Sequence, residues 1–240
     1  MKTRNLVMLL FFLGMTVVSI GQEDGGKGKP VSLSGSAGIT NNGISLIPNF
    51  SLGDPATLFN VSVSKGRLSF ASDFNFSLEA KPWYILYWAR YQLVDAEKFK
   101  LGTGTHLGLN FLSSTMQYER YWVIDLTPTY ILSRKVSLGA YYLHSRGLDP
   151  GTVGASHFLT LQVNVTNIQI VKDFHLGFNP QIYFLKQDDP HGFYATSTLS
   201  LSKQDFPLTL VALINQPLRT EIVAGNEFVW NLSLLYTYSL

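Results

Sequence analysis

The sequence predicts an all-β protein, a transmembrane antiparallel up-and-down β-barrel of about twelve strands, with ten to fourteen as the range. Charged residues make up only 14% of the chain, against about 25% in typical soluble domains. Aromatic residues reach 13%. After residue 21 no apolar run is long enough for a membrane-spanning helix, but short segments of alternating apolar and polar residues continue to the C-terminus.

The N-terminus predicts export from the cytoplasm. Residues 1–21 have Lys2 and Arg4 before a short apolar run and small residues before Gln22, as in a cleaved signal peptide. Residues 22–30 are rich in Gly and charge and are expected to be a flexible periplasmic segment, which leaves 31–240 for the barrel. The chain has no Cys, so neither a disulfide nor a lipid anchor is expected.

The charge balance gives no reason to expect a nucleic-acid partner. The chain has 18 Lys and Arg and 16 Asp and Glu, and the signal peptide holds two of the bases and none of the acids. The mature chain would therefore be formally neutral, and it has no basic stripe.

Segment 155–171 shows the alternation clearly. Leu159 and Leu161 share one face, and Thr160 and Gln162 share the other. A secreted soluble sandwich or a lipocalin-like barrel is the alternative, but its outer face would carry many Lys and Glu. The polar faces here consist mainly of Ser, Thr, Asn, Gly and Tyr. This composition favours lipid on one side of the sheet and a wet lumen on the other.

Turn signals divide the chain into twelve predicted strands, an even number as in most bacterial barrels. Segment 31–40 also alternates weakly, and it could pair with the first strand, lie in the lumen or change the count. The strands are expected at 44–53, 57–65, 66–79, 82–94, 98–112, 116–133, 135–146, 155–171, 174–186, 191–203, 207–217 and 226–240.

The last strand has its large apolar residues at even positions, which we expect to face lipid. Aromatic residues near strand ends, including Trp83, Trp122 and Tyr130, would lie at the two membrane interfaces. The connections on the predicted outer side are short, which argues against a large gating lid. The expected lipid-facing residues of the closing strand are Phe228, Trp230, Leu232, Leu234, Tyr236 and Tyr238.

The chain resembles the small outer-membrane β-barrel proteins of Bacteroidota. The resemblance rests on the leader that ends in Gly21 and Gln22, on the strand count, and on the closing strand FVWNLSLLYTYSL. It covers the mature chain and implies location in the outer membrane of a Gram-negative cell, surrounded by lipid and lipopolysaccharide. It also implies recognition of the last strand by the barrel assembly machinery, although that signal commonly ends in Phe and this chain ends in Leu240.

Residue parity predicts which polar side chains line the lumen. Hairpin register is expected to bring Asp73 opposite or diagonal to Arg90, and His106 close to Asp125. These groups could form ion pairs that bridge neighbouring strands, or they could line a permeation path. The candidate lumen residues are Asp73, Arg90, Lys98, Lys100, His106, Glu119, Asp125, His175 and Gln181.

The sequence gives little support for an enzyme or a metal site. His144 and Ser145 lie near a predicted rim, but adjacent residues of a strand point to opposite faces, so His144 would not activate Ser145. The five His are scattered singly, and no cofactor or metal motif is present. We therefore expect no enzymatic activity, no metal and no cofactor.

A barrel of about twelve strands lies between filled eight-stranded barrels and open porins of 16 to 18 strands. Five aromatic residues are expected inside and would narrow its lumen: Tyr84, Trp88, Tyr141, Tyr183 and Tyr194. The function that the sequence favours is a narrow passive pore or a small-solute transport protein. The alternative is an occluded structural or interaction barrel, and a barrel lipid hydrolase is the least favoured. The sequence does not predict an oligomeric state.

Overall fold

The structure, a computed structural model, describes residues 30–112 and 114–239. The predicted signal peptide, the segment 22–30 except Pro30, and Leu240 lie outside the described residues. The chain divides into two units, 1–30 and 31–240, and the strands described below all belong to the second unit.

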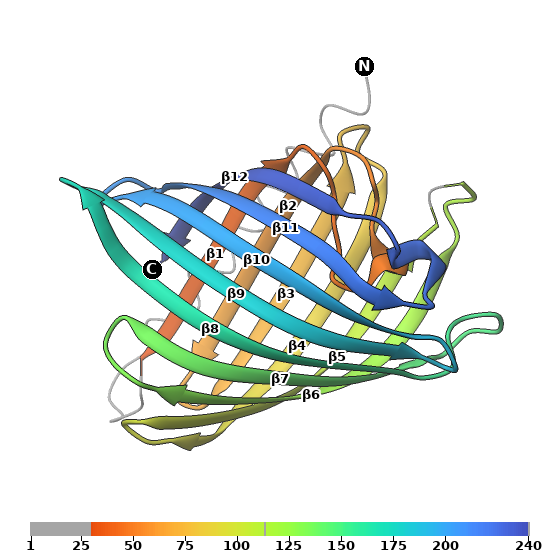
Figure 1. The fold of residues 1–240 in the computed structure, drawn as a ribbon, viewed down its shortest axis with the longest axis horizontal. Coiled ribbons are helices and arrows are strands. Elements are labelled where there is room, and N and C mark those ends of the chain that lie inside the picture. Colours follow the sequence, from red (N-terminus) through yellow and green to blue (C-terminus); the bar gives the residue numbers. More distant parts are fainter. Residues whose placement is uncertain (1–29, 113, 240) are drawn as a thin grey trace. The chain divides into compact units, whose positions relative to one another are not determined.

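The second unit is a closed β-barrel in which every strand pairs antiparallel with the two strands beside it (Figure 1). The described residues form twelve strands, and the predicted fold class is confirmed. The strands are β1 (Val31–Thr40), β2 (Ala56–Lys65), β3 (Leu68–Ser77), β4 (Pro82–Asp95), β5 (Phe99–Phe111), β6 (Tyr118–Ile131), β7 (Val136–Gly147), β8 (Ser156–Val171), β9 (Phe174–Gln187), β10 (His191–Lys203), β11 (Leu208–Thr220) and β12 (Val229–Ser239).

The alternation of the sequence becomes the two faces of the barrel wall. On β8, Leu161 is 57% exposed on the outer face, whereas its neighbour Thr160 is 2% exposed and faces the interior. Large apolar side chains are exposed over the outside of most strands, and Ser, Thr, Asn and Gln recur inside. Apolar side chains outside and polar side chains inside are the reverse of the distribution in a soluble protein, and they are expected where lipid surrounds the barrel.

The two ends of the barrel differ in the length of their connections. At the end where β2 meets β3, the connections have two to four residues, and we call it the turn end. At the opposite end, the loop end, they have three to fifteen residues, the longest being 41–55 between β1 and β2. In outer-membrane barrels short turns face the periplasm and longer loops face outward.

The predicted strand 44–53 is wrong. This segment lies in the loop 41–55, where its only regular element is a single 3-10 turn, η2 (Pro48–Phe50). The first strand is instead 31–40, which pairs over its whole length with β2 and also pairs with β12. The segment 44–53 alternates because its apolar side chains pack inside the barrel, and Pro48 has no N–H for a strand ladder.

We expect a cysteine pair to report the closure of the barrel. Ser36 lies opposite Thr237 in the β1–β12 ladder, and the chain has no native Cys to interfere. The variant Ser36→Cys/Thr237→Cys should form a disulfide on mild oxidation, because directly opposed positions lie about 4.5–5.5 Å apart at Cβ. Non-reducing gel electrophoresis measures it as a mobility shift.

The control is Ser36→Cys/Ser200→Cys, which places the second thiol on β10. Disulfide formation in the control, or its absence in the Ser36→Cys/Thr237→Cys variant, would contradict the closure by β1.

Candidate functional site

The loop 41–55 folds into the mouth of the barrel at the loop end (Figure 1). Ile47 and Phe50 pack against a buried cluster on the inner wall, and the Phe50 ring lies edge-on to Tyr121 with ring centroids 4.9 Å apart. Apolar side chains leave water here just as they would in a soluble core. The outer connections were expected to be short because 44–53 was predicted as a strand, and the connection 41–55 is longer than that prediction allowed.

Trp83 of β4 holds the loop in place. Its indole Nε1–H donates a hydrogen bond of 2.8 Å to the Phe50 carbonyl, and its side chain is buried. The expectation that Trp83 lies at a membrane interface is therefore wrong. A register shift between Asn75 and Phe76, in the β3–β4 ladder, lies beside Trp83 and changes the alternation at this end of the strand.

A second anchor joins the loop to the far side of the mouth. The Asn49 side-chain amide donates a hydrogen bond of 3.0 Å to Gln187 Oε1 at the end of β9. Pro48 also packs closely against Gly225 of η3 (Val223–Gly225), in the connection between β11 and β12. The loop is thus fixed to β4, to β9 and to the β11–β12 connection.

The buried cluster behind the loop is mainly aromatic. Tyr183 of β9 and Tyr194 of β10 stack with their ring planes 10° apart and their centroids at 4.7 Å. Tyr183 donates a hydrogen bond to Asn215 Oδ1, and Tyr194 Oη is 2.7 Å from Thr220 Oγ1. These residues fill the β8–β11 side of the mouth, so the remaining space lies toward β4–β7.

Deeper in the lumen, five side chains form a contact network that we call the Arg90 cluster. Arg90 Cζ lies 3.7 Å from the centroid of the Trp88 ring, which is a cation–π contact. The His106 ring also packs against Trp88, and the two ring centroids are 3.7 Å apart. Trp88 Nε1–H donates to Asp73 Oδ2 at 3.1 Å. Arg90 Nε is 3.6 Å from Asp125 Oδ2, and the Asp125 side chain is fully buried.

The register of two hairpins differs from the one expected. Asp73 lies opposite Leu86 rather than Arg90, because Phe76 already pairs with Pro82 and the turn of the hairpin therefore lies earlier in the chain than expected. Asp73 is held instead by Trp88 and by Asn60 Nδ2, which donates to its carboxylate at 2.7 Å. The predicted pairing of Asp73 with Arg90 is therefore wrong.

The second hairpin is shifted by two residues. His106 lies opposite Val123, and Asp125 lies opposite Gly104. His106 is thus one lumen-facing step from Asp125, and its ring packs on Trp88 instead. Asp125, which the expected register placed close to His106, is instead the ion-pair partner of Arg90.

The remaining predicted lumen residues do not join the Arg90 cluster. Lys100 pairs with Asp95 at 2.9 Å near the turn end, and both side chains are about half exposed. Lys98 lies in the exposed β4–β5 turn, outside the strands. Glu119 accepts a hydrogen bond from Tyr121 near the loop end. His175 lies on β9 near the turn end.

Gln181 belongs to a polar ladder on β8 and β9. Asn179 Nδ2 donates to Asn164 Oδ1 at 2.6 Å, and Gln181 Nε2 donates to Asn179 Oδ1 at 3.0 Å. Thr160 Oγ1 is 3.4 Å from Gln181 Oε1. The ladder gives this wall uncharged donors and acceptors that water or a polar solute can use.

Glycine makes room for the Arg90 cluster on the neighbouring strand. A Cβ atom on Gly104 would lie 2.7 Å from Arg90 Cγ and 3.1 Å from Asp125 Oδ2. Gly102 and Gly108 occupy the same face of β5, where added Cβ atoms would approach Thr127 and Leu86. The spacing of Gly in LGTGTHLG is the sequence signal that could have located the cluster.

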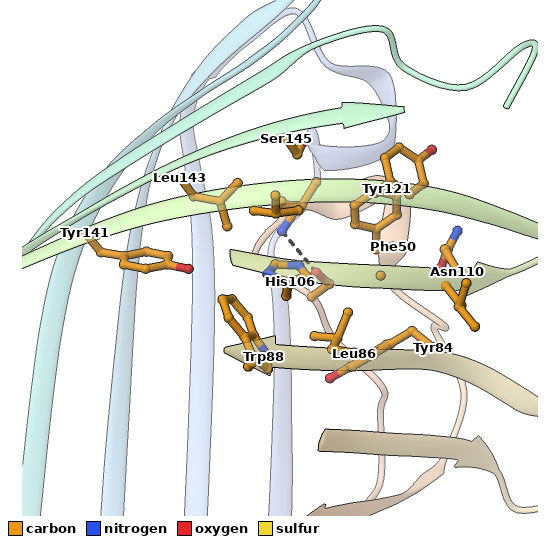
Figure 2. A pocket seen from close by; sticks show the side chains of 15 residues that line it. Phe50, Tyr84, Leu86, Trp88, His106, Asn110, Tyr121, Tyr141, Leu143 and Ser145 are labelled. Carbon is orange, nitrogen blue, oxygen red and sulfur yellow. Dashed lines mark hydrogen bonds between the residues drawn. The ribbon is translucent and has the colours of Figure 1, made fainter. Parts of the chain in front are cut away.

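Three cavities follow one another along the interior. The first, of about 180 Å³, lies beneath the loop and is lined mainly by apolar and aromatic side chains from β4–β7. Figure 2 shows Trp88, Leu86 and Tyr84 on one side of it and Tyr141 and Leu143 on the other.

The second cavity, of about 370 Å³, adjoins the first across Ile47 and Tyr141, and Thr160, Gln162 and Gln181 contribute to its polar wall. The third, of about 280 Å³, is bordered by Thr127, which it shares with the second, and by Arg90 and Lys100. The interior therefore offers a series of neighbouring spaces, apolar beneath the loop and more polar toward the turn end.

The closing strand presents large side chains to the outside. The six residues expected to face lipid are all exposed, from 37% for Tyr238 to 53% for Phe228 and Trp230. Those between them are Leu232, Leu234 and Tyr236.

No assembled catalytic or metal site is found in the described residues. Ser145 is buried and lines the first cavity, whereas His144 lies on the outer face against His157, so the two point to opposite faces as expected. Among residues 30–112 and 114–239, no group of three His, Cys, Asp or Glu side chains is placed to hold a metal ion. Neither described helix is long enough to cross a membrane.

The barrel resembles solved outer-membrane proteins. An outer membrane channel from Pseudomonas putida F1 matches with a TM-score of 0.53 and 13% identity, over 91% of this chain and 100% of the channel. The NanC porin matches with a TM-score of 0.48 and 12% identity over 85% and 97% of the two chains.

LpxR from Salmonella typhimurium matches with a TM-score of 0.45 and 9% identity, over 85% of this chain and 99% of that protein. No protein-family profile matches the chain, and no curated protein is similar to it in sequence. At these identities the comparisons show the fold, which is that of an outer-membrane β-barrel.

Removing Arg90 should destabilise the barrel more than removing an exposed lysine. Arg90→Ala leaves the buried Asp125 carboxylate without its counter-charge, and because the Arg90 side chain is itself 40% exposed, the loss should be about 2 kcal/mol, below the ~3–5 kcal/mol of a fully buried pair. Urea unfolding, followed by the tryptophan fluorescence, measures the change.

Lys100→Ala breaks a half-exposed pair and should cost about 1 kcal/mol or less. The double variant Arg90→Ala/Asp125→Asn should recover part of the loss. Equal effects of Arg90→Ala and Lys100→Ala would contradict the assignment of a buried pair.

Proposed function

We propose that this protein is a narrow passive pore of the outer membrane for small polar solutes, with its aperture set by the loop 41–55. The observation that carries the proposal is the series of three cavities that share lining residues from beneath the loop toward the turn end. A filled structural barrel needs no such series of neighbouring spaces.

The lining supports passage of small polar molecules. The hydroxyl and amide groups of Thr127, Thr160 and Gln181 line part of the second cavity, and both charge signs occur at the Arg90 cluster. A solute passing there could exchange water for protein hydrogen bonds at several sites of modest strength, which allows entry and release. The matched protein from Pseudomonas putida F1 is an outer membrane channel, which adds support by analogy of fold.

The route to the membrane is part of the proposal. Cleavage after residue 21 and recognition of β12 by the barrel assembly machinery would deliver the chain to the outer membrane of a Gram-negative cell of Bacteroidota type. The exposed aromatic residues Tyr236 and Tyr238 near the end of β12 suit that recognition.

A second candidate function is an occluded structural or interaction barrel. It is favoured by the hydrogen bonds that fix the loop to Trp83 and Gln187, and by the stacked Tyr183 and Tyr194 that fill one side of the mouth. Single-channel recordings separate the two candidates, because an occluded barrel conducts no ions at any applied voltage.

Shortening the loop should widen the pore. Replacing residues 44–53 with a short Gly–Ser linker removes Ile47 and Phe50 from the mouth, and we expect a several-fold increase in single-channel conductance in planar bilayers. Trp83→Phe removes the hydrogen bond to the Phe50 carbonyl and part of the ring that packs near Gly43, and it should raise the frequency of large openings.

The matched control is Trp230→Phe, since Trp230 is 53% exposed on the outer face. Trp230→Phe should leave the conductance unchanged. A silent wild type together with a silent loop variant would exclude the pore and leave the occluded barrel.

Changing the charge of the Arg90 cluster should alter ion selectivity. Asp73→Asn preserves the shape of the side chain and removes one negative charge from the lumen, so permeability should shift toward anions. The reversal potential in a KCl gradient measures the shift. Asp205→Asn, in the β10–β11 turn, is the control and should leave the reversal potential near its wild-type value. Equal shifts in the two variants would show that Asp73 does not border the ion path.

A further inference from the structure

The outer face of β7–β10 carries a horizontal row of basic side chains near the loop end. His144 of β7 lies opposite His157 of β8. His157 lies opposite Lys186 of β9, and Lys186 lies opposite His191 of β10. We call these four residues the basic row. With neighbouring strands about 4.8 Å apart, the row spans about 15 Å of the wall.

The row faces outward, away from the lumen. Its residues share the face of Leu159 and Leu161, which are strongly exposed, while the intervening Phe158 and Leu185 are buried inside. The rings of His144 and His157 lie 4.7 Å apart at their centroids, and His157 Nδ1 is 2.9 Å from Tyr142 Oη. Three of the five His of the chain stand here, which a sequence reading of singly scattered His could not reveal.

Two arginines extend the positive charge. Arg146 follows His144 on the same face of β7, one step closer to the loop end. Arg219 of β11 lies opposite the outward-facing Phe193. Within the part of the chain that the structure describes, Lys186, Arg146 and Arg219 form no ion pair.

Most nearby acids are already engaged. Asp149 is bound by Arg120, and these hydrogen bonds hold the pKa of Asp149 below its usual range. Asp188 accepts hydrogen bonds from the backbone N–H groups of residues 154 and 155. Glu221 lies 2.9 Å from His191 Nδ1, and Asp189 is exposed in the β9–β10 turn. Among the described residues, Lys186 therefore keeps its charge unpaired within the row, whereas the carboxylates of Asp188 and Asp189 lie beyond it in the β9–β10 turn.

The residues below the row place it at a definite depth in a membrane. The next outward positions toward the turn end are, from β7 to β10, Tyr142, Leu159, Phe184 and Phe193, which are opposed in register. The positions below those are Ala140, Leu161, Ile182 and Ala195. This order, with aliphatic side chains below, aromatic rings above them and bases on top, follows the hydrocarbon, interface and headgroup layers of a bilayer.

We propose that the basic row, with Arg146 and Arg219, binds the phosphate groups of an anionic glycolipid headgroup in the outer leaflet. Lys186 and the two arginines supply permanent positive charge, and the imidazoles supply hydrogen-bond donors, the groups that recognise phosphate oxygens. The aromatic row beneath would contact the upper part of the acyl chains. The site is outside the lumen and does not depend on whether the barrel conducts.

The test measures binding of bisphosphorylated lipid A to the purified barrel in detergent by native mass spectrometry. Wild-type protein should retain the lipid, and Lys186→Gln/Arg219→Gln should weaken binding about tenfold, because two charge-assisted contacts are lost. Lipid A stripped of its phosphates should bind wild-type protein as weakly as phosphorylated lipid A binds the variant.

The matched control is Lys172→Gln/Lys203→Gln, which removes two lysines at the turn end. It should bind phosphorylated lipid A like the wild type. A heat-modifiable gel shift checks that each variant is folded. His157→Gln should also weaken binding of phosphorylated lipid A, by less than Lys186→Gln/Arg219→Gln. Unchanged binding by the folded Lys186→Gln/Arg219→Gln variant, equal loss in the control, or full competition by inorganic phosphate would overturn the proposal.

Discussion

The pairing of β1 with both β2 and β12 is the constraint on which the rest of the structure depends. In lipid, an unpaired strand edge would leave a row of backbone N–H and C=O groups without partners, so the sheet must close on itself. Closure pairs β1 with β12, and on its other side β1 pairs with β2 through a connection of fifteen residues. That surplus chain folds inward, where Ile47 and Phe50 find an apolar wall. The connection between the first two strands of the closed barrel therefore also fills its mouth.

Each face of the wall is adapted to its own surroundings. On the outer face of β7–β10, aliphatic, then aromatic, then basic residues follow one another from the turn end toward the loop end, within a few residues of each strand. Inside, polar side chains pair with one another, and the bulky Arg90 and Trp88 are accommodated because β5 carries Gly102 and Gly104 beside them. Large and small residues thus alternate between adjacent strands, as in any close-packed interior.

Most of the fold could be predicted because the side chains of a strand alternate with a period of two. That period fixes which residues share a face, but not how far one strand slides along its neighbour. The turn between β3 and β4 lies earlier in the chain than expected, which separates Asp73 from Arg90, and the irregularity beside Asn75 leaves Trp83 unpaired in the ladder and buried. Register depends on turns and bulges whose backbone geometry the side-chain pattern does not encode.

The exchange of 44–53 for 31–40 has a different cause. Both segments alternate, since an apolar face packs equally well against lipid or against the inner wall. Pro48 in the middle of the rejected segment and Pro55 just after it were the available signal, because proline interrupts a strand ladder. The weaker alternation of 31–40 arises from Gly35 and Gly38, which lie close to Tyr238 and Leu235 of the closing strand.

The anchoring of the loop has a mechanical consequence. Trp83 belongs to β4 and Gln187 to β9, strands that lie on nearly opposite sides of the twelve-membered ring. The loop therefore links two nearly opposite strands across the mouth, and this link opposes a change of the rim from a circular to an elliptical cross-section. Any movement of the loop out of the mouth must break its hydrogen bond to Trp83 or to Gln187. Opening the mouth and changing the shape of the rim are therefore coupled.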